Sequence, residues 1–353
     1  MKKISTVIVT GGAGFIGSHT CLSLLERGYR VIILDSFVNS SKASIRRLQS
    51  LINKKNELFK GTFKFVEGDL RNKDLVENIF VNSIQENKPI SGVIHLAGLK
   101  AVSESLIKPL DYWDINLYST INLLKIMDRY LCKTIIFSSS ATIYGKVNDN
   151  LIDENSFINP VNPYGNTKAS IERMLEDLFK SNPKEWRISS LRYFNPIGAH
   201  PSAIIGEDPC KRPNNIFPLI TGVAIGRYKR LSVYGNDWNT NDGTGVRDYI
   251  HVYDLAEGHV LTLEHLLRNE SKLLNLNLGT GKGTTVLELI RTFEEVNNVK
   301  VPYEFVSRRE GDLASVVANN KKATSILDWS PKRSITDMCR DGWKWELNKN
   351  KLL

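Results

Sequence analysis

Short apolar runs alternate with amphipathic stretches over the first half of the chain. The run from Ser5 to Thr10 leads into a glycine-rich turn, a helical pattern that extends to about Arg27, and a second apolar run from Val31 to Asp35. This order predicts a β-α-β unit with two parallel strands and a right-handed crossover. Further strand-like runs lie at 63–66, 92–96, 134–138 and 188–192, with helical patterns such as 74–84 and 118–130 between them. The pattern therefore predicts an α/β fold with a doubly wound parallel sheet that is buried on both faces.

The pattern changes after about Asn195. Residues 196–215 contain four prolines and two glycines, and residues 235–245 are also rich in turn-forming residues. Both segments are therefore predicted to be long loops. We divide the chain into a first domain, residues 1–195, and a smaller C-terminal α/β domain, residues 196–353, and we leave open an exchange of strands between the two lobes.

The composition agrees with a two-domain globular protein. The 353 residues suffice for about two domains, and 41% apolar with 24% charged residues excludes a disordered or collagen-like chain. No apolar run approaches the roughly 18 residues of a membrane helix. The glycine turn at Gly11 interrupts the basic start before the apolar core of a signal peptide forms, so we expect a cytoplasmic protein with no membrane partner.

The net charge of +9 is concentrated in two segments. Residues 42–60 carry a net charge of +5 and residues 321–353 a net charge of +4, so together they supply the whole excess. Aromatic residues do not alternate with the basic ones in residues 42–60, where Phe59 stands alone. We interpret the two segments as a solvated basic loop and tail and expect no nucleic-acid partner. A salt-sensitive shift of DNA or RNA, without NAD in the purified protein, would favour the nucleic-acid alternative.

The four cysteines are scattered along the chain, at positions 21, 132, 210 and 339. They form no CxxC pair, which fits a reducing compartment with thiols packed as small apolar groups. Histidine and cysteine do not cluster either, so no metal site is predicted.

A glycine motif and an acidic residue suggest a nucleotide site. Gly11, Gly14 and Gly17 follow the first strand and open a helix, where glycines let the backbone approach a pyrophosphate and the helix N-terminus offers free N–H groups. Asp35 ends the second strand, 18 residues after Gly17, where a carboxylate accepts hydrogen bonds from an adenosine ribose and repels a 2′-phosphate. This favours NAD over NADP, although a glycine turn followed by an Asp at a strand end is also common without a ligand.

Two further features carry acid–base groups. Tyr164 and Lys168 stand four residues apart on a predicted helix that extends to about Phe179, so both face the same way. An ammonium near a phenol favours the phenolate, which makes a general base for an alcohol proton. About one such Tyr-Lys spacing is expected by chance among twelve tyrosines, so the spacing alone does not decide. Ser138 to Ser140 follow the strand at 134–137, at a strand end where hydroxyls can reach a ligand or merely cap the strand.

The order of these features is more specific than each alone. The chain has, in this order, a glycine turn, an acidic strand end, a Ser/Thr strand end and a Tyr-Lys pair. This arrangement resembles the extended short-chain dehydrogenase/reductase family. The resemblance implies a Rossmann-type sheet that binds NAD(P), and hydride chemistry that uses Ser or Thr, Tyr and Lys.

Further segments narrow the resemblance. The stretches that resemble successive motifs of the UDP-glucose 4-epimerases in that family are 95–102, 137–145, 163–168, 191–195, 242–252 and 308–312. The resemblance spans about residues 4–329, and residues 49–61 look like an insertion. It implies reversible C4 epimerisation of UDP-glucose and UDP-galactose with NAD that stays bound. Residues 1–195 would then bind NAD, and residues 196–353 would bind the UDP-hexose.

The resemblance also implies roles for three residues. Tyr164, as a phenolate, would remove the O4 proton while hydride leaves C4 for the nicotinamide, which gives a 4-ketose. The sugar would rotate and take the hydride back on its other face. Ser140 would hydrogen-bond O4, and Lys168 would hold the nicotinamide ribose and keep Tyr164 acidic.

The positions that match the family's binding residues fall into a cofactor group and a substrate group. The cofactor group is Gly11, Gly14, Phe15, Ile16, Gly17, Asp35, Asn39, Ser40, Asp69, Leu70, Leu96, Ala97, Gly98, Lys100, Asn116, Ser138, Tyr164, Lys168 and Tyr193. The substrate group is Ser140, Tyr164, Asn195, Asn215, Ile216, Ser232, Tyr234, Arg247, Arg309, Asp312 and Val316. Two arginines suit a pyrophosphate, because a guanidinium makes paired charge-assisted hydrogen bonds.

One position suggests a wider sugar specificity. Val316 stands where many relatives limited to UDP-glucose and UDP-galactose have Tyr, and a smaller side chain leaves volume near C2 of the sugar. We hypothesise that UDP-N-acetylglucosamine and UDP-N-acetylgalactosamine are also epimerised. The alternative is that Val316 packs in the core. The resemblance further implies a homodimer, paired through helices near 117–130 and 164–179.

Two other functions compete with epimerisation. A nucleotide-sugar dehydratase or decarboxylase of the same family is the nearest, but the dehydratase type carries Thr-Asp-Glu where this chain has Ser139, Ser140 and Ala141. A non-catalytic NAD-binding regulator is the other, and it would not need Ser140, Tyr164 and Lys168 together.

Overall fold

The computed structural model describes the chain except residues 1–4, 55–58, 146–150, 211–212, 310 and 352–353. The chain forms two compact units. The first comprises residues 1–145, 158–192 and 256–276, and the second comprises residues 146–157, 193–255 and 277–353. The boundary expected at 195/196 lies close to the change of unit at 192/193. Two segments, 146–157 and 256–276, belong to the unit on the other side of that boundary.

A seven-stranded sheet in the order β11-β6-β5-β4-β1-β2-β3 forms the centre of the first unit. Its strands are β1 Thr6–Thr10, β2 Arg30–Asp35, β3 Thr62–Glu67, β4 Ile90–His95, β5 Thr134–Ser140, β6 Arg187–Tyr193 and β11 Lys272–Leu278. β1 pairs in parallel with β2 and with β4, β2 with β3, and β4 with β5. The predicted Rossmann-type α/β fold is therefore confirmed, and β11 is the strand that the apolar pattern missed.

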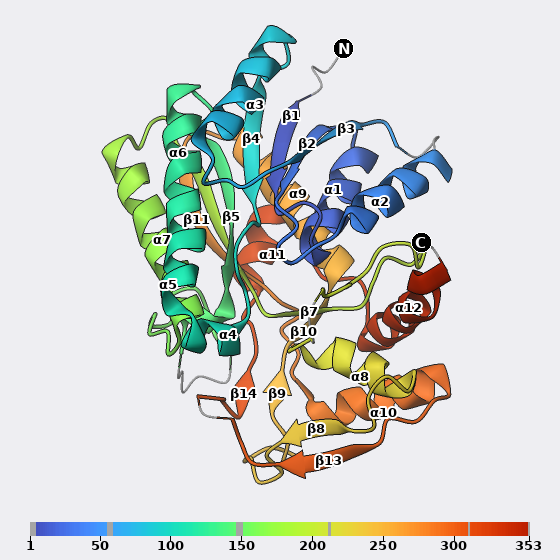
Figure 1. Ribbon diagram of the computed structural model, residues 1–353. Helices are drawn as coiled ribbons and strands as arrows, with labels where there is room; N and C mark the ends of the chain where they lie inside the picture. The colour runs from blue at the N-terminus through green and yellow to red at the C-terminus, as the bar shows by residue number, and fades with distance from the viewer. Residues whose placement is uncertain (1–4, 55–58, 146–150, 211–212, 310, 352–353) are drawn as a thin grey trace. The chain divides into compact units, whose positions relative to one another are not determined.

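Helices cover both faces of this sheet (Figure 1). They are α1 Phe15–Glu26, α2 Lys42–Lys54, α3 Lys73–Gln85, α4 Val102–Ile107, α5 Pro109–Tyr112, the π-helix η2 Trp113–Tyr118, α6 Ser119–Arg129, the 3-10 helix η3 Ala141–Ile143, α7 Pro163–Ser181 and α9 Val252–Arg268. One face packs against α3, α6 and α7, whose side chains Phe80, Met127 and Leu175 are buried with Ile8 and Ile135 of the strands. Burial of each such side chain contributes a free energy of about 2 kcal/mol, which holds these layers together.

The basic segments are not the loop and tail that their charge suggested. Residues 42–54 form α2, which buries Ala43, Arg47, Leu48 and Leu51 at helical spacing, so the loop prediction is wrong there. Residues 55–58 of the expected insertion lie outside the described part of the chain. The C-terminal segment is also helical, with α11 Lys321–Leu327, α12 Ile335–Asn348 and a short 3-10 helix, η4 Lys349–Lys351. The high net charge of these segments favoured the prediction of a loop and a tail. In the amphipathic helices, lysine and arginine occupy the solvent side while the apolar residues face inward.

The second unit is built from small sheets and helices. Its further elements are β7 Asn195–Ile197, α8 Ile216–Ala224, β8 Leu231–Tyr234, β9 Val246–Arg247, β10 Tyr249–His251, β12 Thr284–Thr285, α10 Val286–Asn297, β13 Tyr303–Val306 and β14 Ser315–Val316. The sheets are β10-β7, β12-β9-β14 and β13-β8. Phe217 of α8, Phe293 of α10 and Met338 of α12 share one core.

Both predicted loops lie in the second unit. Residues 235–245, all of them described, contain no helix or strand, as predicted. Residues 196–215 include the end of β7 and an isolated bridge between Ala199 and Gly206. Within the described residues, no helix is both long enough and apolar enough to cross a membrane.

Candidate active site

The glycine turn after β1 is closely packed on one side and open on the other. Gly11 has a φ of 68°, and an added Cβ would lie 2.7 Å from the Ala97 nitrogen. On Gly17 an added Cβ would lie 2.2 Å from the Gly11 carbonyl oxygen, so neither position accepts a side chain. On Gly14 the nearest described atom would be that same oxygen, at 3.2 Å, and no other lies within 4 Å. The turn therefore leaves space beside Gly14 for a ligand to approach the backbone.

Helix α1 begins at this open side. Its N-cap is Gly14, which offers no side-chain hydrogen bond to the first turn, and Phe15 and Ile16 are the first two helical residues. Their N–H groups carry the positive end of the helix dipole, and an anion such as a pyrophosphate would satisfy them. The structure thus brings together the predicted residues Gly11, Gly14, Phe15, Ile16 and Gly17.

Asp35 is held beside the turn by three hydrogen bonds. Its Oδ2 accepts from the Ala13 N–H at 2.9 Å, and its Oδ1 accepts from the Phe37 N–H at 2.9 Å and from the Ser40 hydroxyl at 2.7 Å. The carboxylate is buried at the end of β2, and Asn39 nearby in sequence is exposed. Since each carboxylate oxygen accepts more than one hydrogen bond, this fixed group remains able to bind a ribose diol.

The remaining predicted cofactor residues line the ends of the neighbouring strands. Asp69 accepts hydrogen bonds from the Arg71 side chain, which lower the pKa of its carboxyl, and Arg71 also pairs with Asp114. The Asn116 amide, in η2, is fully used: it accepts from the Leu99 N–H at 2.7 Å and donates to the Leu99 carbonyl and to Thr167. The other members are the buried Leu70, Ser138 and Tyr193, the half-buried Leu96, Ala97 and Gly98, and the exposed Lys100.

Ser140 and Tyr164 meet where β5 ends and α7 begins. Ser140 is the last residue of β5, and its Oγ accepts from the N–H of Thr142 at 3.2 Å and from the Thr142 hydroxyl at 3.0 Å. Tyr164 is the second residue of α7, whose first turn is capped by the Asn162 side chain. The Tyr164 and Ser140 hydroxyls share a hydrogen bond, which lowers the pKa of Tyr164. Burial acts more strongly in the other direction, so the pKa of Tyr164 is raised above its usual value.

Lys168 lies one turn further along α7 and is buried. Its Nζ donates to the Ser138 carbonyl at 2.6 Å and lies 4.8 Å from the ring centre of Phe137 and 5.8 Å from that of Tyr164. Burial lowers the pKa of Lys168 to about 7, and the charge of Glu172 partly opposes this. Burial favours the neutral form of both groups, and the expectation that Lys168 keeps Tyr164 acidic remains a prediction.

Sequence reasoning missed a buried ion pair beside these residues. Arg192 donates to both carboxylate oxygens of Glu172 and to the Tyr144 hydroxyl. The only available signals were the position of Glu172, four residues after Lys168, and that of Arg192 inside a recognised motif. Neither signal shows that the two side chains meet, because they lie on different elements.

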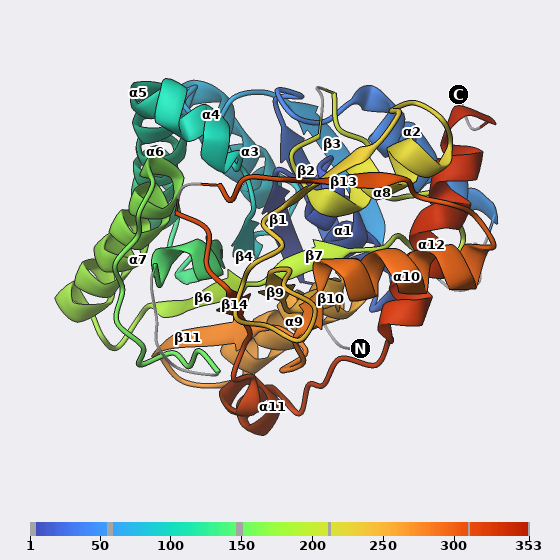
Figure 2. The ribbon, with the colours of Figure 1, turned by 90° about the horizontal axis from the view of Figure 1, so that it is seen from below.

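Predicted substrate residues of the second unit cluster around two strands and a stacked pair. β14 pairs with β9 so that Val316 stands opposite Arg247 (Figure 2). Arg247 Nη1 donates to the Leu313 carbonyl at 2.9 Å, and its Nη2 lies 3.7 Å from the Asp312 carboxylate. The Arg309 guanidinium stacks 3.7 Å above the ring centre of Tyr234. Val316 is half-buried, so it is not part of the packed core.

Other predicted substrate residues of this unit occupy separate positions. Ser232 and Tyr234 lie on the exposed face of β8, whose alternate residues are buried. Asn195 belongs to β7, and Asn215 is the N-cap of α8, which begins at Ile216. Asn215 Nδ2 donates to the Glu207 carboxylate at 3.0 Å, a contact that the sequence did not reveal. Among the described residues, Asn215 makes no direct hydrogen bond to the Arg247 cluster.

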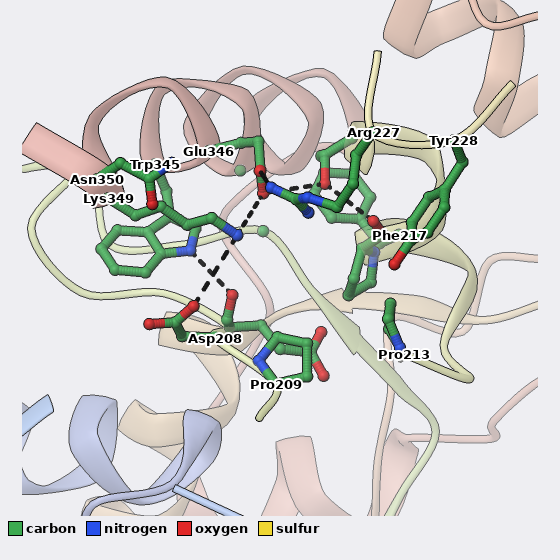
Figure 3. A pocket seen from close by; sticks show the side chains of 15 residues that line it. Asp208, Pro209, Pro213, Phe217, Arg227, Tyr228, Trp345, Glu346, Lys349 and Asn350 are labelled. Carbon is green, nitrogen blue, oxygen red and sulfur yellow. Dashed lines mark hydrogen bonds and ion pairs between the residues drawn. The ribbon is translucent and has the colours of Figure 1, made fainter. Parts of the chain in front are cut away.

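A cavity of about 600 Å³ lies in the second unit, next to the start of α8 (Figure 3). Its walls come from the loop before α8, from α8 and from α12 and η4, and buried Glu346 pairs there with Arg227 and Lys349. None of the predicted site residues lines the cavity, but Glu207, the hydrogen-bond partner of Asn215, does. The described part of the chain also holds no group of His, Cys, Asp and Glu side chains that could bind a metal ion.

Comparisons with known proteins agree with this geometry. The model of a family described as GDP-mannose 4,6 dehydratase matches residues 8–342. A UDP-glucose 4-epimerase of Bacillus subtilis is 47% identical over 340 residues, which cover 96% of each chain.

Two solved structures extend the comparison to three dimensions. The UDP-glucose 4-epimerase of Stenotrophomonas maltophila, with bound NAD and formylated UDP-arabinopyranose, superposes with a TM-score of 0.91 at 41% identity, covering 99% of this chain and all of the other. The Bifidobacterium longum enzyme, in complex with NAD+ and UDP, gives a TM-score of 0.90 at 43% identity with the same coverage. The similarity thus includes both units of the chain.

The buried ammonium of Lys168 makes stability depend on pH. An unfolded lysine keeps its proton up to a pKa of about 10.4, whereas folded Lys168 loses it near 7, so the unfolded state binds more protons between these values. The free energy of unfolding of the nucleotide-free protein should therefore rise from pH 7 to pH 9 relative to Lys168→Met. Urea denaturation at both pH values measures the difference. Lys180→Met, an exposed lysine of the same helix, is the control, and parallel curves for Lys168→Met and wild type would contradict the assignment.

Proposed function

The chain belongs to the UDP-glucose 4-epimerase family, and from this we propose that it interconverts UDP-glucose and UDP-galactose by NAD-dependent epimerisation at C4. The observation that carries the proposal is the pair of buried Tyr164 and Lys168 beside the half-buried Ser140, in the unit that also holds an open glycine turn. Similarity extends over nearly the full length of the relatives, so the proposal concerns the whole reaction.

The residues of the first unit fit NAD. The uncapped start of α1 would bind the pyrophosphate, and Asp35 would accept hydrogen bonds from the adenosine ribose. Lys168 would hold the nicotinamide ribose through its Nζ. A fixed carboxylate at Asp35 disfavours a 2′-phosphate, which supports NAD over NADP. When bound, NAD supplies the acceptor and donor of hydride for C4.

The proton of the reaction is moved by Tyr164. Its phenolate takes the proton from O4 as hydride leaves C4, and it returns the proton when hydride comes back to the other face of the 4-keto sugar, so only the configuration at C4 changes. Ser140 would hydrogen-bond O4 and keep it aligned with the Tyr164 oxygen. Since burial raises the pKa of Tyr164, its ionisation needs positive charge nearby, which Lys168 and an oxidised nicotinamide provide.

Residues of the second unit would hold the nucleotide. Arg247 and Arg309 would bind the pyrophosphate of UDP, and Asp312, 3.7 Å from Arg247, would accept hydrogen bonds from the uridine ribose. Asn195, Asn215, Ile216 and the exposed face of β8 would complete the contacts. This assignment rests on matched motif positions together with the arginine cluster.

A dehydratase of the same family is the second candidate, since a family model of that description matches the chain. Elimination of water needs a carboxylic acid after β5. The chain has Ser139, Ser140 and Ala141 there, and the first unit places a hydroxyl, not an acid, beside Tyr164. These residues favour epimerisation.

We further propose a homodimer in the cytoplasm. α6 and α7 lie side by side at one side of the first unit, and Tyr118 just before α6 is 50% exposed (Figures 1 and 2). These helices match the segments through which family members pair. Cys21, Cys132 and Cys339 are buried thiols, and cysteines packed in this way fit a reducing compartment.

Removal of the proposed base tests the mechanism. Tyr164→Phe should lower kcat for UDP-galactose by about 100-fold or more, because proton transfer by a positioned group contributes 10²–10⁴-fold. Bound NAD, released by denaturation and measured by absorbance, should remain at the wild-type level. Tyr303→Phe, at an exposed tyrosine, is the control. Full activity of Tyr164→Phe would overturn the mechanism.

The half-buried Val316 predicts turnover of N-acetylated substrates. Wild type should epimerise UDP-N-acetylglucosamine as well as UDP-glucose, and Val316→Tyr should lose only the first activity, because the larger ring fills the space near C2. Val316→Ala should retain both. Coupled assays of the two sugar pairs measure this, and a wild type without N-acetyl turnover would exclude the wider specificity.

The oligomeric state provides a separate test. Light scattering during size-exclusion chromatography should give twice the chain mass of 39.9 kDa. Tyr118→Glu should shift the mass towards that of one chain. Tyr118 is exposed in the single chain, and a dimer would bury the new carboxylate at this position, which costs free energy. A single-chain mass for wild type would refute the dimer.

A further inference from the structure

A buried ion pair links the elements that carry the proposed catalytic residues. Arg192, in β6, is 1% exposed and donates to Glu172 through Nε at 3.1 Å and through Nη2 at 2.7 Å. Its Nη1 donates to the Tyr144 hydroxyl at 2.9 Å, and the guanidinium lies 5.1 Å from the ring centre of Tyr144. Glu172 is 7% exposed and Tyr144 is fully buried.

Glu172 and Tyr144 stand close in sequence to the catalytic set, and Arg192 joins them from the neighbouring strand. Glu172 follows Lys168 by one helical turn on α7, so the two side chains share a face of the helix. Tyr144 immediately follows η3, the short helix that begins after Ser140. β6, which carries Arg192, is the neighbour of β5 in the sheet. Arg192 therefore joins α7 to the segment that leads away from Ser140.

Stability alone does not account for such a pair. Taking two charges out of water is expensive, and apolar side chains of similar volume often stabilise a protein equally well or better at such a place. What apolar side chains cannot supply is the fixed direction of three hydrogen bonds or a negative charge beside Lys168. Both properties bear on the geometry and protonation of the catalytic set.

We infer that Arg192, Glu172 and Tyr144 form a positioning network for the epimerisation proposed above. Arg192 holds α7 at Glu172, two turns beyond Tyr164, relative to the segment that follows β5, and so keeps the Tyr164 hydroxyl beside Ser140. Glu172 places a negative charge near Lys168 and favours its ammonium form. The inference rests on the proposed function but concerns residues that touch neither sugar nor cofactor.

The charges around Lys168 are few. On α7 it faces Tyr164 and Glu172, and on β5 it meets the Ser138 carbonyl and the Phe137 ring, which do not titrate. His95 of β4 is the other titratable neighbour, and burial lowers the pKa of His95 to about 3, so it stays neutral above pH 6. A change in the titration of Lys168 between pH 6 and 10 therefore reports on Glu172 and Tyr164.

The double substitution Glu172→Met with Arg192→Met separates positioning from stability. It removes both charges and keeps the volume, so the melting temperature and the NAD content should match wild type. The kcat for UDP-galactose should fall by about 10- to 100-fold with KM within about twofold, because misplacement of reacting groups by about 1 Å costs up to 10²-fold. Asp177→Asn, at an exposed aspartate of the same helix, should change nothing.

Two smaller changes test the network even if the double variant does not fold. Glu172→Gln keeps the shape but loses the charge, so Lys168 should lose its proton earlier, and the alkaline limb of kcat should move to lower pH by roughly 0.5 or more. Tyr144→Phe removes one hydrogen bond and should lower kcat by a few fold without moving that limb.

The outcomes distinguish this inference from the proposed function. A wild type without epimerisation overturns both. An active wild type with a folded, fully active double Met variant overturns the network alone. Wild-type kcat and pH profiles in both Glu172→Gln and Tyr144→Phe would likewise overturn it.

Discussion

Lys168 and Tyr164 are buried together at the carboxyl end of β5, and the chemistry of the first unit depends on the contacts that compensate for this burial. Burial drives both groups towards their neutral forms: it raises the pKa of Tyr164 and lowers the pKa of Lys168 to about 7. A base made from this pair needs compensating contacts. The Ser138 carbonyl, the Ser140 hydroxyl and the Glu172 carboxylate provide them, and each comes from an element fixed by the parallel sheet.

The same sheet explains why the glycine turn and the acid–base set belong to one unit. In a doubly wound sheet the carboxyl ends of the strands form one edge, where loops and helix N-termini are free to bind ligands. β1 ends at the Gly11 turn, β2 ends at Asp35 and β5 ends at Ser140. The order β5-β4-β1-β2 brings those ends along one edge, although Ser140 follows Asp35 by more than a hundred residues in the chain.

The local pattern of apolar residues predicted most strands of the sheet. Contacts between residues far apart in the chain could not be predicted from it. The apolar runs at β1, β2 and β4 were recognisable because strands buried on both faces carry continuous apolar residues. β11 alternates Leu with Asn and was missed, and α2 was mistaken for a loop because its basic charge was weighed without the helical spacing of Leu48 and Leu51. Tyr164, Lys168 and Ser140 were found through motif and position. The Arg192–Glu172 pair was not, because it forms only when β6 lies beside β5.

The assignment of residues 256–276 to the first unit bears on how the polypeptide folds during synthesis. β11 is an edge strand of the sheet, next to β6, and it is made some eighty residues after β6 is complete. A nascent chain that ends near residue 195 has the strands of the nucleotide-binding sheet but exposes the unpaired edge of β6, a template for wrong strand pairing. Completion of the first unit therefore waits until about half of the second unit has been made. A fragment that ends at residue 195 would lack β11, and the edge of β6 would remain unpaired.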